Sequence, residues 1–550
     1  MATRNDIADV IFPNIKETIA DLENKFPPRK NPICSRYAPS PTGFVHIGNI
    51  YASLVESQFS HQNWWTFFLR IEDTDQKRLT EWWIEIIINW FKKFWIAIDE
   101  WPIWPENWDV WSYGPYIQSK RKYFYEVFVK ELISKWLAYP CRIAEEEINQ
   151  IRENQTKSKL VPWIYGKFSV RRDKSVDDVF DKLKEENWKY QVIRFRSPAD
   201  LTKKIIFHDE IRWDVNMIDN YNDVVLIKWD GLPTYHMAHV ADDHLMRVSH
   251  VIRAEEWLTS VPLHLQLFEA CGLEHPKYCH PAQILKLDEG NKRKLSKRKD
   301  PEADVEFFFG RWYPVQWIIE YLMWIISSEF EWWQTNNPDK SYKDFEINFD
   351  KMNHAWALFD LIKLNSVCNN YMSRISTDEL YEKTLERADK YNPDFAILMQ
   401  SDIEYTKSAI NIERKTIKDP KRFTNFKDVE NQILFFYDGE REKLFVNKPV
   451  LPEIFSQDLI GKFIEEYSKV LDLNMTTEDW FTQLKEIWKR IWFASNNAEF
   501  KEWWYVWKIG DLAMFLRVQL CCANQTPDLF SVMKVMGKER VFKRLEKILI

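Results

Sequence analysis

One stretch near the start of the chain constrains the fold most, the segment Arg36-Tyr-Ala-Pro-Ser-Pro-Thr-Gly-Phe-Val-His-Ile-Gly-Asn49. Residues 33–38, which lead into it, read as a short buried strand, and residues 50–61 read as a helix. A strand that enters a tight turn and then a helix N-terminus is where α/β folds bind phosphate, because the first N–H groups of a helix lack intrahelical partners. The stretch therefore predicts an anion site, in which Gly48 permits close approach and His46 donates to a phosphate oxygen.

This stretch resembles the "HIGH" signature of class I aminoacyl-tRNA synthetases. A second string, Leu69-Arg-Ile-Glu-Asp-Thr-Asp75, follows at the separation found in the bacterial glutamyl/glutaminyl branch of that family. The two strings together are far more specific than a four-residue HxGx motif. The resemblance covers most of the chain and is strongest from 34 to 300. It implies a Rossmann-like α/β catalytic domain with an acceptor-binding insertion, followed by an all-α stem-contact and anticodon-binding region.

The activity that the resemblance implies is the ATP-dependent attachment of L-glutamate to tRNA(Glu) through a glutamyl-adenylate. Such chemistry depends on positioning and on neutralisation of charge more than on a protein nucleophile. The sequence has no GxxxxGK[ST] phosphate loop. It has instead the HIGH-like turn and the basic string Lys294-Leu-Ser-Lys-Arg298, which resembles the "KMSKS" signature.

The resemblance also indicates which side chains serve each substrate. The catalytic contacts are expected from His46, Lys294 and Lys297. The ATP-binding residues are expected to be His46, Gly48, Asn49, Ile284, Lys294, Ser296, Lys297 and Arg298. Glutamate carries two carboxylates, which guanidinium groups pair best. Its expected contacts are Arg36, Ala38, Ser40, Glu72, Tyr235, His239, Arg253 and Glu256.

Composition narrows the class of protein further. The net charge of −7 indicates that any tRNA surface must come from local basic patches. No uncharged apolar run reaches membrane-spanning length, and the N-terminus lacks an apolar signal region. Seven cysteines without a disulfide spacing are typical of a reducing compartment. We therefore expect a cytoplasmic protein without a membrane partner, and a monomer.

Changes in pattern along the chain predict six segments. Alternating strand and helix signals give way after about residue 300 to helical patterns. The expected segments are an N-terminal extension (1–30), the first half of the catalytic domain (31–136), the acceptor-binding insertion (137–225), the second half of the catalytic domain (226–300), a helical stem-contact region (301–375) and a helical anticodon-binding domain (376–550).

Metal binding is expected only through the nucleotide. Some relatives hold zinc in the insertion on closely spaced cysteines, but Cys141 stands alone there, and one cysteine cannot build a tetrahedral site. Asp242, Asp243 and His244 have the composition of a metal cluster, yet in this family a structural or tRNA-facing role is expected. Mg²⁺ should arrive with ATP and need no protein cage.

Three alternatives to a glutamate-specific enzyme stay open at this point. A glutamine–tRNA ligase would share the catalytic strings, but its anticodon-binding part is built of β-barrels, whereas residues 376–550 read as helices. The sequence does not distinguish a ligase that charges both tRNA(Glu) and tRNA(Gln) with glutamate from one that charges tRNA(Glu) alone. An inactive tRNA-binding homologue is disfavoured by the intact HxGx and KLSKR strings.

The tryptophan content is abnormal. The chain has 28 tryptophans and 12 glycines, and their sum, 40 of 550, is about the usual 7% share of glycine alone. Tryptophan stands where glycine is expected at Trp64, Trp65, Trp136 and Trp312, and related sequences have glycine at several such positions. One hypothesis is that most of these residues are glycine in the native protein, which predicts UGA codons at Trp64, Trp65, Trp104 and Trp136, and UGG at Trp257, where the family has tryptophan. The alternative is an unusually aromatic protein.

Overall fold

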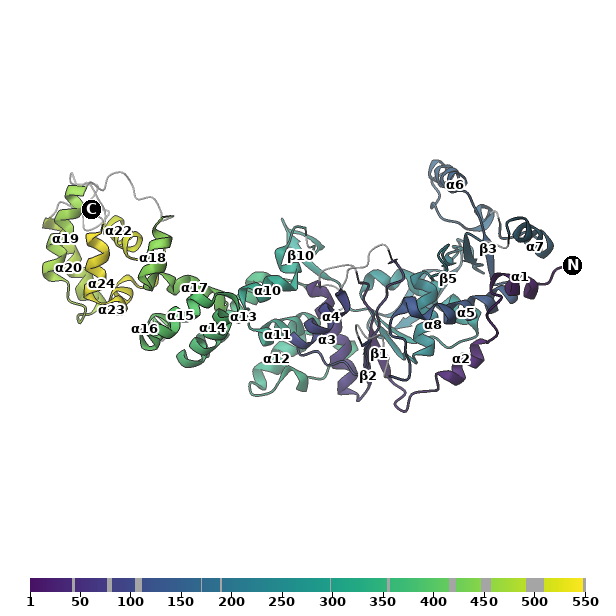
Figure 1. Cartoon of the computed structure of the whole chain (residues 1–550), viewed down its shortest axis with the longest axis horizontal. Coiled ribbons are helices and arrows are strands. Elements are labelled where there is room, and N and C mark those ends of the chain that lie inside the picture. The colour runs from purple at the N-terminus through teal and green to yellow at the C-terminus, as the bar shows by residue number, and fades with distance from the viewer. Residues whose placement is uncertain are drawn as a thin grey trace. The chain divides into compact units, whose positions relative to one another are not determined.

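The computed structural model describes most of the chain, as two compact units. It describes residues 1–41, 45–76, 82–103, 111–169, 171–187, 190–296, 298–353, 357–414, 422–446, 457–490 and 509–547. The first unit comprises Met1–Val305 and Ile318–Asp360, and the second comprises Glu306–Trp317 and Leu361–Ile550 (Figure 1).

Parallel strands form the centre of the first unit. They are β1 (Cys34–Tyr37), β2 (Thr66–Leu69), β8 (His250–Ile252) and β9 (Lys277–Cys279). The pairs β1–β2 and β8–β9 are parallel, and the Ser249 N–H donates to the Cys34 carbonyl at 2.9 Å, which places β8 beside β1. In such a sheet the carboxyl ends of the strands meet at one edge, where ligands bind. The predicted α/β catalytic domain is thus confirmed.

Mixed and antiparallel strands surround this centre. They are β3 (Ala138–Cys141), β4 (Val192–Phe195), β5 (Lys204–Asp209), β6 (Trp213–Ile218), β7 (Val225–Ile227), β10 (Ile284–Asp288), β11 (Asn291–Lys294) and β12 (Ala357–Leu358). β3, β4 and β7 form one antiparallel sheet, and β5 joins β9 while pairing with β6 as a hairpin. β10 and β11 form the hairpin that leads into the KLSKR string. β12 pairs in parallel with β10, a long-range pairing that the local sequence pattern does not predict.

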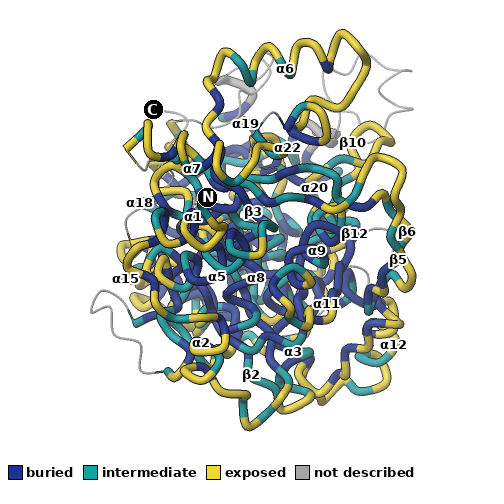
Figure 2. The backbone as a smooth tube through the Cα atoms, turned by 90° about the vertical axis from the view of Figure 1, so that its right-hand side faces the viewer, coloured by how far each residue is buried: buried dark blue, intermediate teal, exposed yellow. Residues whose placement is uncertain are grey.

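Helices cover the strands of the first unit. They are α1 (Arg4–Ile11), α2 (Ile19–Lys25), α3 (Ile47–Gln62), α4 (Trp83–Lys93), α5 (Lys122–Ser134), α6 (Glu145–Lys157), α7 (Val176–Glu185), α8 (Tyr235–Leu245), α9 (Val261–Cys271) and α12 (Ser328–Asn336). Two more, α10 (Val305–Arg311) and α11 (Val315–Ile326), contribute residues to both units. Figure 2 shows α5 and α8 largely buried and α6 largely exposed. The apolar face of α5 and the polar sequence of α6 agree with this, whereas α8 is buried together with its polar residues His239, Asp242 and Asp243.

The N-terminal extension is part of the main core. Thr3 and Thr18 cap α1 and α2, each through a capping box with an aspartate three residues on. The apolar faces of both helices pack on α5, and Ile7 and Leu22 are fully buried in the same cluster as the catalytic sheet. These residues therefore stabilise the first unit directly.

The described part of the second unit is helical. Its helices are α13 (Leu361–Arg374), α14 (Thr377–Tyr391), α15 (Pro393–Ser401), α16 (Ile403–Asn411), α17 (Phe426–Ile433), α18 (Asp438–Phe445), α19 (Gln457–Val470), α20 (Thr477–Arg490), α22 (Ile509–Cys521), α23 (Leu529–Met536) and α24 (Lys538–Glu546). One apolar cluster runs from Met372 to Leu545 and includes residues of all these helices except α18. The predicted all-α region is confirmed.

The packing of α1 generates a stability prediction. Ile7→Ala should lower the free energy of unfolding by about 2–5 kcal/mol, because it opens a cavity in the main core. The matched control is Ile206→Ala on β5, whose side chain is 66% exposed and whose loss should cost less than about 0.5 kcal/mol. Denaturant titrations measure both. Equal effects of the two substitutions would contradict the packing of α1 into the core.

Candidate active site

A cavity of about 450 Å³ opens where β1 and β8 end and α3 begins. This volume is typical of pockets for small ligands. Its walls include twelve of the residues expected from sequence: Arg36, Ala38, Ser40, His46, Gly48, Asn49, Glu72, Tyr235, Arg253, Glu256, Ile284 and Lys294. Residues far apart in the chain, from both predicted halves of the catalytic domain, thus meet at one site.

The HIGH-like turn presents a helix N-terminus to the cavity. His46 is the N-cap of α3, and its Nδ1 accepts a hydrogen bond from the Gly48 N–H at 2.9 Å. The His46 N–H donates in turn to Asn49 Oδ1 at 2.9 Å, which completes a capping box. Because Nδ1 is an acceptor, the neutral imidazole carries its proton on Nε2. The ring is therefore oriented to donate from Nε2 to an anion.

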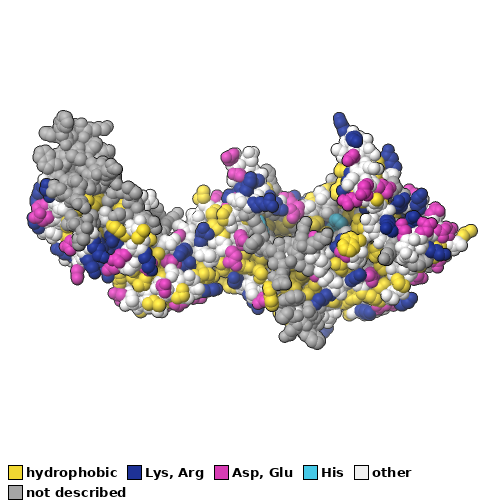
Figure 3. All heavy atoms as spheres, turned by 45° about the horizontal axis from the view of Figure 1, so that its top comes forward, with side chains coloured by type: hydrophobic (Ala, Val, Ile, Leu, Met, Phe, Trp, Pro, Cys, Tyr) yellow, Lys and Arg dark blue, Asp and Glu magenta, His cyan; other side chains and the backbone are white. Residues whose placement is uncertain are grey.

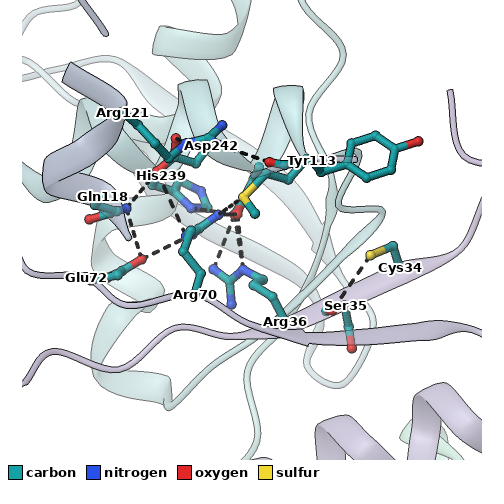
Figure 4. A network of polar contacts seen from close by, with 12 residues as sticks. Cys34, Ser35, Arg36, Arg70, Glu72, Tyr113, Gln118, Arg121, His239 and Asp242 are labelled. Atoms are coloured by element: carbon teal, nitrogen blue, oxygen red, sulfur yellow. Dashed lines mark hydrogen bonds and ion pairs between the residues drawn. The ribbon is translucent and has the colours of Figure 1, made fainter. Parts of the chain in front are cut away.

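A buried carboxylate organises the arginines beneath the cavity. Arg36 at the end of β1 donates through Nε and Nη2 to Asp243 of α8, at 3.2–3.3 Å. Arg70 Nη1 donates to the same carboxylate at 2.6 Å and its Nη2 donates to Glu72 at 3.1 Å (Figure 4). Although burial opposes it, the two guanidinium groups hold the pKa of Asp243 well below its ordinary range. Asp243 therefore remains an anion that fixes both arginines.

Glu72 lies at the same strand edge as predicted. Its Oε1 accepts from Arg70 at 3.1 Å and lies 3.5 Å from Gln118 Nε2. Burial raises the pKa of Glu72, while Arg70 and Arg36 oppose the shift. A cation such as an α-ammonium group would pair with this carboxylate.

Arg253 at the end of β8 is held on three sides. Its Nη1 donates to the Tyr235 hydroxyl at 3.0 Å, its Nε to His280 at 3.1 Å, and its Nη2 lies 3.3 Å from His264 Nδ1. The guanidinium also lies 5.0 Å from the ring centroid of Tyr278. All these partners are neutral acceptors or an aromatic face, so the charge of Arg253 has no carboxylate partner among them.

The KLSKR string lies partly on the cavity wall. Lys294 ends β11, lines the cavity and donates from Nζ to Glu256 at 2.7 Å. Ser296 and Arg298 do not line the cavity, and Lys297 lies outside the described residues. Lys and Arg side chains are interspersed with Asp and Glu on the face seen in Figure 3.

One expected glutamate contact lies behind the cavity. His239 is fully buried, with Nδ1 2.8 Å from Asp243 and Nε2 3.1 Å from the Tyr278 hydroxyl. Burial lowers the pKa of His239 to about 3, so the ring is neutral. In this structure it does not line the cavity and contacts Asp243 and Tyr278 instead.

Sequence reasoning missed Glu56, which lines the cavity from α3. It is 2% exposed, and burial raises its pKa well above the ordinary value. The signal was available, since His46, Asn49, Ala52 and Glu56 recur at helical spacing and all line the cavity. The sequence pattern singled out Trp257 only as a position where the family has tryptophan. In the structure its ring lies 4.3 Å from that of Tyr235 and forms part of the cavity wall.

The acidic string after His239 is structural. Asp242 is fully buried and accepts from Arg121, Tyr125 and Gln118, while His244 contacts Glu23. Cys141 is a buried free thiol in β3. Within the ranges that the structure describes, no group of three or more His, Cys, Asp or Glu side chains is arranged to hold a metal ion.

The arrangement suits a reaction between an anionic substrate and a nucleotide phosphate. Two buried arginines can hold carboxylates at the strand ends. The N-terminus of α3, with His46 and Lys294 nearby, can bind and neutralise phosphates. Both binding areas share one cavity, which brings a carboxylate oxygen to a phosphorus atom without a protein nucleophile.

Comparison with known proteins agrees with this geometry. Residues 32–357 match the family described as tRNA synthetases class I (E and Q), catalytic domain, and residues 420–549 match an anticodon binding domain. The chain belongs to the class I tRNA synthetases of this E and Q family, an enzyme family of ligases that use ATP.

Its relatives span its whole length. The chain is 41% identical to a glutamate–tRNA ligase of Clostridium perfringens (strain SM101 / Type A) and 38% identical to one of Clostridium beijerinckii, over 99% of each chain. A crystal structure of a glutamate tRNA ligase from Elizabethkingia meningosepticum, in complex with its amino acid, superposes with a TM-score of 0.66 at 27% identity, covering 94% of this chain and 99% of that one. None of the helices in the described ranges is long and apolar enough to cross a membrane.

Two buried histidines, His250 in β8 and His280 directly after β9, predict a pH-dependent stability. Burial lowers the pKa of His250 and of His280 to about 4, from an ordinary 6.5. Between these values the unfolded chain binds protons that the folded chain does not, so stability is full above about pH 6.5 and falls toward pH 4. Each histidine contributes about 1.4 kcal/mol per pH unit in that window. Denaturant titrations from pH 7 to 4.5 measure the slope, and His250→Gln should reduce it by one histidine's share. An unchanged slope in that variant would contradict the assignment.

Proposed function

We propose that this chain is a glutamate–tRNA ligase, which attaches L-glutamate to tRNA(Glu) through a glutamyl-adenylate. The observation that carries the proposal is the pair of buried arginines, Arg36 and Arg253, in one cavity with the capped N-terminus of α3. The names of the relatives, which match over 99% of the chain, support the same substrate.

The residue roles follow from charge and position. Arg36 takes the side-chain carboxylate of glutamate, and Arg253 with the Tyr235 hydroxyl takes its α-carboxylate, directly or through water. Glu72 pairs with the α-ammonium group, and Ala38 and Ser40 line the strand exit. His239 and Glu256 act through their neighbours, since one supports Asp243 and the other holds Lys294.

ATP lies across the start of α3. The His46 Nε2–H and the N-terminal N–H groups of α3 bind its phosphates, Gly48 and Asn49 shape the turn, and Ile284 packs on the adenosine. Lys294, Ser296, Lys297 and Arg298 close over the triphosphate and neutralise charge that develops on it. Mg²⁺ arrives with ATP as part of the substrate.

With Cys141 isolated, elemental analysis should find no stoichiometric zinc.

The remaining segments serve tRNA. We assign the acceptor end to residues 137–225, the stem to 301–375 and the anticodon to 376–550, with the catalytic domain formed by 31–136 and 226–300 and extended by 1–30. The match of residues 420–549 to an anticodon binding domain supports this order. The enzyme acts as a monomer in the cytoplasm.

One experiment separates the proposal from its alternatives. Purified protein is given ATP, glutamate or glutamine, and tRNA(Glu) or tRNA(Gln), and charged tRNA is measured. Glutamate on tRNA(Glu) alone is expected, and charging with glutamine would overturn the proposal. Glutamate on both tRNAs would make the enzyme non-discriminating. The helices of the second unit already disfavour a glutamine ligase with a β-barrel anticodon region.

Arg36 provides a test of the substrate carboxylate. Arg36→Gln should weaken glutamate binding by about 2–5 kcal/mol, because it removes a charged partner from a buried carboxylate. Glutamate-dependent exchange of pyrophosphate into ATP measures the effect as KM. Asp243 keeps Arg70 as a partner, so the fold should survive. Wild-type affinity for glutamate in this variant would assign the carboxylate to another arginine.

Lys297 provides a test of the basic loop. Lys297→Ala should lower glutamyl transfer by about 10²-fold, the scale for loss of one preorganised charge contact. Lys299→Ala is the matched control, an exposed lysine two residues further on that is not assigned to ATP. The control should charge tRNA at the wild-type rate. Equal rates for both variants would remove Lys297 from the mechanism.

A further inference from the structure

A buried aspartate–histidine pair stands behind Arg253. Asp209 ends β5 and His280 follows β9, and both are fully buried. Asp209 Oδ2 lies 2.6 Å from His280 Nδ1, and His280 Nε2 accepts from Arg253 Nε at 3.1 Å. The three side chains therefore form a line that ends at the cavity.

Asp209 determines which ring nitrogen of His280 carries the proton. Asp209 Oδ1 accepts from the backbone N–H groups of Ile211, Arg212 and His280, at 2.9–3.3 Å. Its Oδ2 is left for the imidazole, so the His280 proton lies on Nδ1 and the lone pair of Nε2 faces Arg253. Burial lowers the pKa of His280 to about 4, which keeps the ring neutral in the working range of pH.

We propose that Asp209 and His280 are positioning residues that orient the Arg253 guanidinium toward the substrate. By accepting from Nε, the histidine fixes the plane of the guanidinium, so that Nη1 meets the Tyr235 hydroxyl, Nη2 lies 3.3 Å from His264 Nδ1, and Arg253 forms part of the cavity wall. The inference rests on the proposed contact between Arg253 and glutamate. Neither residue touches the cavity wall, so both act through Arg253.

The isosteric substitution Asp209→Asn tests the orientation. The three backbone N–H groups keep the amide oxygen at Oδ1, so the amide nitrogen must donate to His280 Nδ1. The ring then carries its proton on Nε2, where it opposes the Arg253 Nε–H. The KM for glutamate should rise by about tenfold or more, with the KM for ATP unchanged.

Three controls decide the result. Asp219→Asn changes another buried carboxylate, which binds Gln266 and not Arg253, and should leave the glutamate KM unchanged. In an Arg253→Lys background, which lacks the Nε–H, Asp209→Asn should add no further effect; an equal rise there would overturn the inference. If Arg253→Lys alone has a normal KM, the proposed substrate contact fails instead.

Should Asp209→Asn not fold, ¹⁵N NMR of the unmutated protein must show His280 protonated at Nδ1, and the opposite tautomer would refute the positioning role.

A second inference comes from the backbone and is independent of the site. Twelve non-glycine residues in the described ranges have a positive φ, and six of them are tryptophan: Trp64, Trp82, Trp95, Trp136, Trp213 and Trp312, with φ of 54–63°. A bulky aromatic residue is strained in this region, which glycine adopts freely.

Four of these tryptophans occupy the same position after a helix. At Trp64, Trp95, Trp136 and Trp312, the residue's N–H bonds the carbonyl three residues earlier, and the next N–H bonds the carbonyl five residues before itself, at 2.8–3.2 Å. This is the Schellman motif, whose C′ residue is usually glycine. Gly272 makes the same two bonds after α9, with φ 75°.

The other two share the positive φ in a different setting. Trp213 follows the three-residue turn of the β5–β6 hairpin, the position of a left-handed bulge residue. Trp82 precedes α4 without a side-chain cap. Two of the six indoles contribute little to packing, since Trp64 is 87% exposed and Trp82 is 59% exposed. By contrast, Trp257 packs against Tyr235 with tilted rings 4.3 Å apart, and Trp480 is buried and donates to the Tyr467 hydroxyl; neither has a positive φ.

We infer that the six tryptophans with positive φ are glycine in the native protein, encoded by UGA. A cell that makes this protein must then contain a tRNA that reads UGA and carries glycine. Trp257 and Trp480 are true tryptophans with UGG codons. Trp65 has no positive φ and packs on Phe59 and His250, so the backbone does not support glycine there, and Trp104 lies outside the described residues.

The gene and the native protein test this inference. UGA at the six codons, UGG at Trp257 and Trp480, and peptide masses with glycine at the six sites are expected. UGG at the six, or tryptophan in the native peptides, would refute it. Recombinant protein gives a physical readout: changing the six to glycine together should raise the thermal midpoint by about 5 °C or more. Trp480→Gly, the control, should lower it, and a six-site variant less stable than the tryptophan form would count against the inference.

Discussion

The carboxylate of Asp243 is the interaction on which the catalytic half of the structure depends. It joins Arg36 of β1, Arg70 beyond β2 and His239 of its own helix, all buried. A buried charge is tolerated only when it is paired and hydrogen-bonded, and removal of one partner costs more than the pair contributes. The two strands and α8 are therefore held in one arrangement, and the site inherits its geometry from that pairing.

This arrangement leaves the cavity with a deficit of negative charge. Arg36 and Arg70 pair with Asp243 and Glu72, whereas Arg253 has no carboxylate among its hydrogen-bond partners in the described residues. Glu56 does not restore the balance, because burial favours its neutral form. A substrate with two carboxylates and one ammonium group supplies the missing charge. Specificity here is a property of the whole cluster, since the arginines would repel one another without their shared aspartate.

The parts of this site that the sequence predicts are those carried by short strings. The strand-turn-helix of Arg36–Asn49 and the edge position of Glu72 follow from local pattern. The partnership of Arg36 with Asp243 does not, because 207 residues separate them and composition alone makes the acidic string resemble a metal cluster. The expectation that His239 contacts glutamate stays a prediction; in the structure His239 lies 2.8 Å from Asp243 and does not line the cavity, and its depth could not be derived from its place in a helix. The parallel pairing of β10 with β12 could likewise not be predicted, because the two strands lie far apart in the sequence.

The helix ends show why backbone geometry can indicate which residue type a position requires when side-chain packing does not. In a Schellman motif two N–H groups must reach carbonyls of the last turn, and this forces φ positive whatever side chain is attached. Packing adapts to an indole, which is why Trp136 and Trp312 lie against their apolar clusters without contradiction. The dihedral angle does not adapt, because the hydrogen bonds fix it. Six indoles with a positive φ, four of them at helix ends whose hydrogen bonds define the conformation, are thus evidence about the residue that the fold requires.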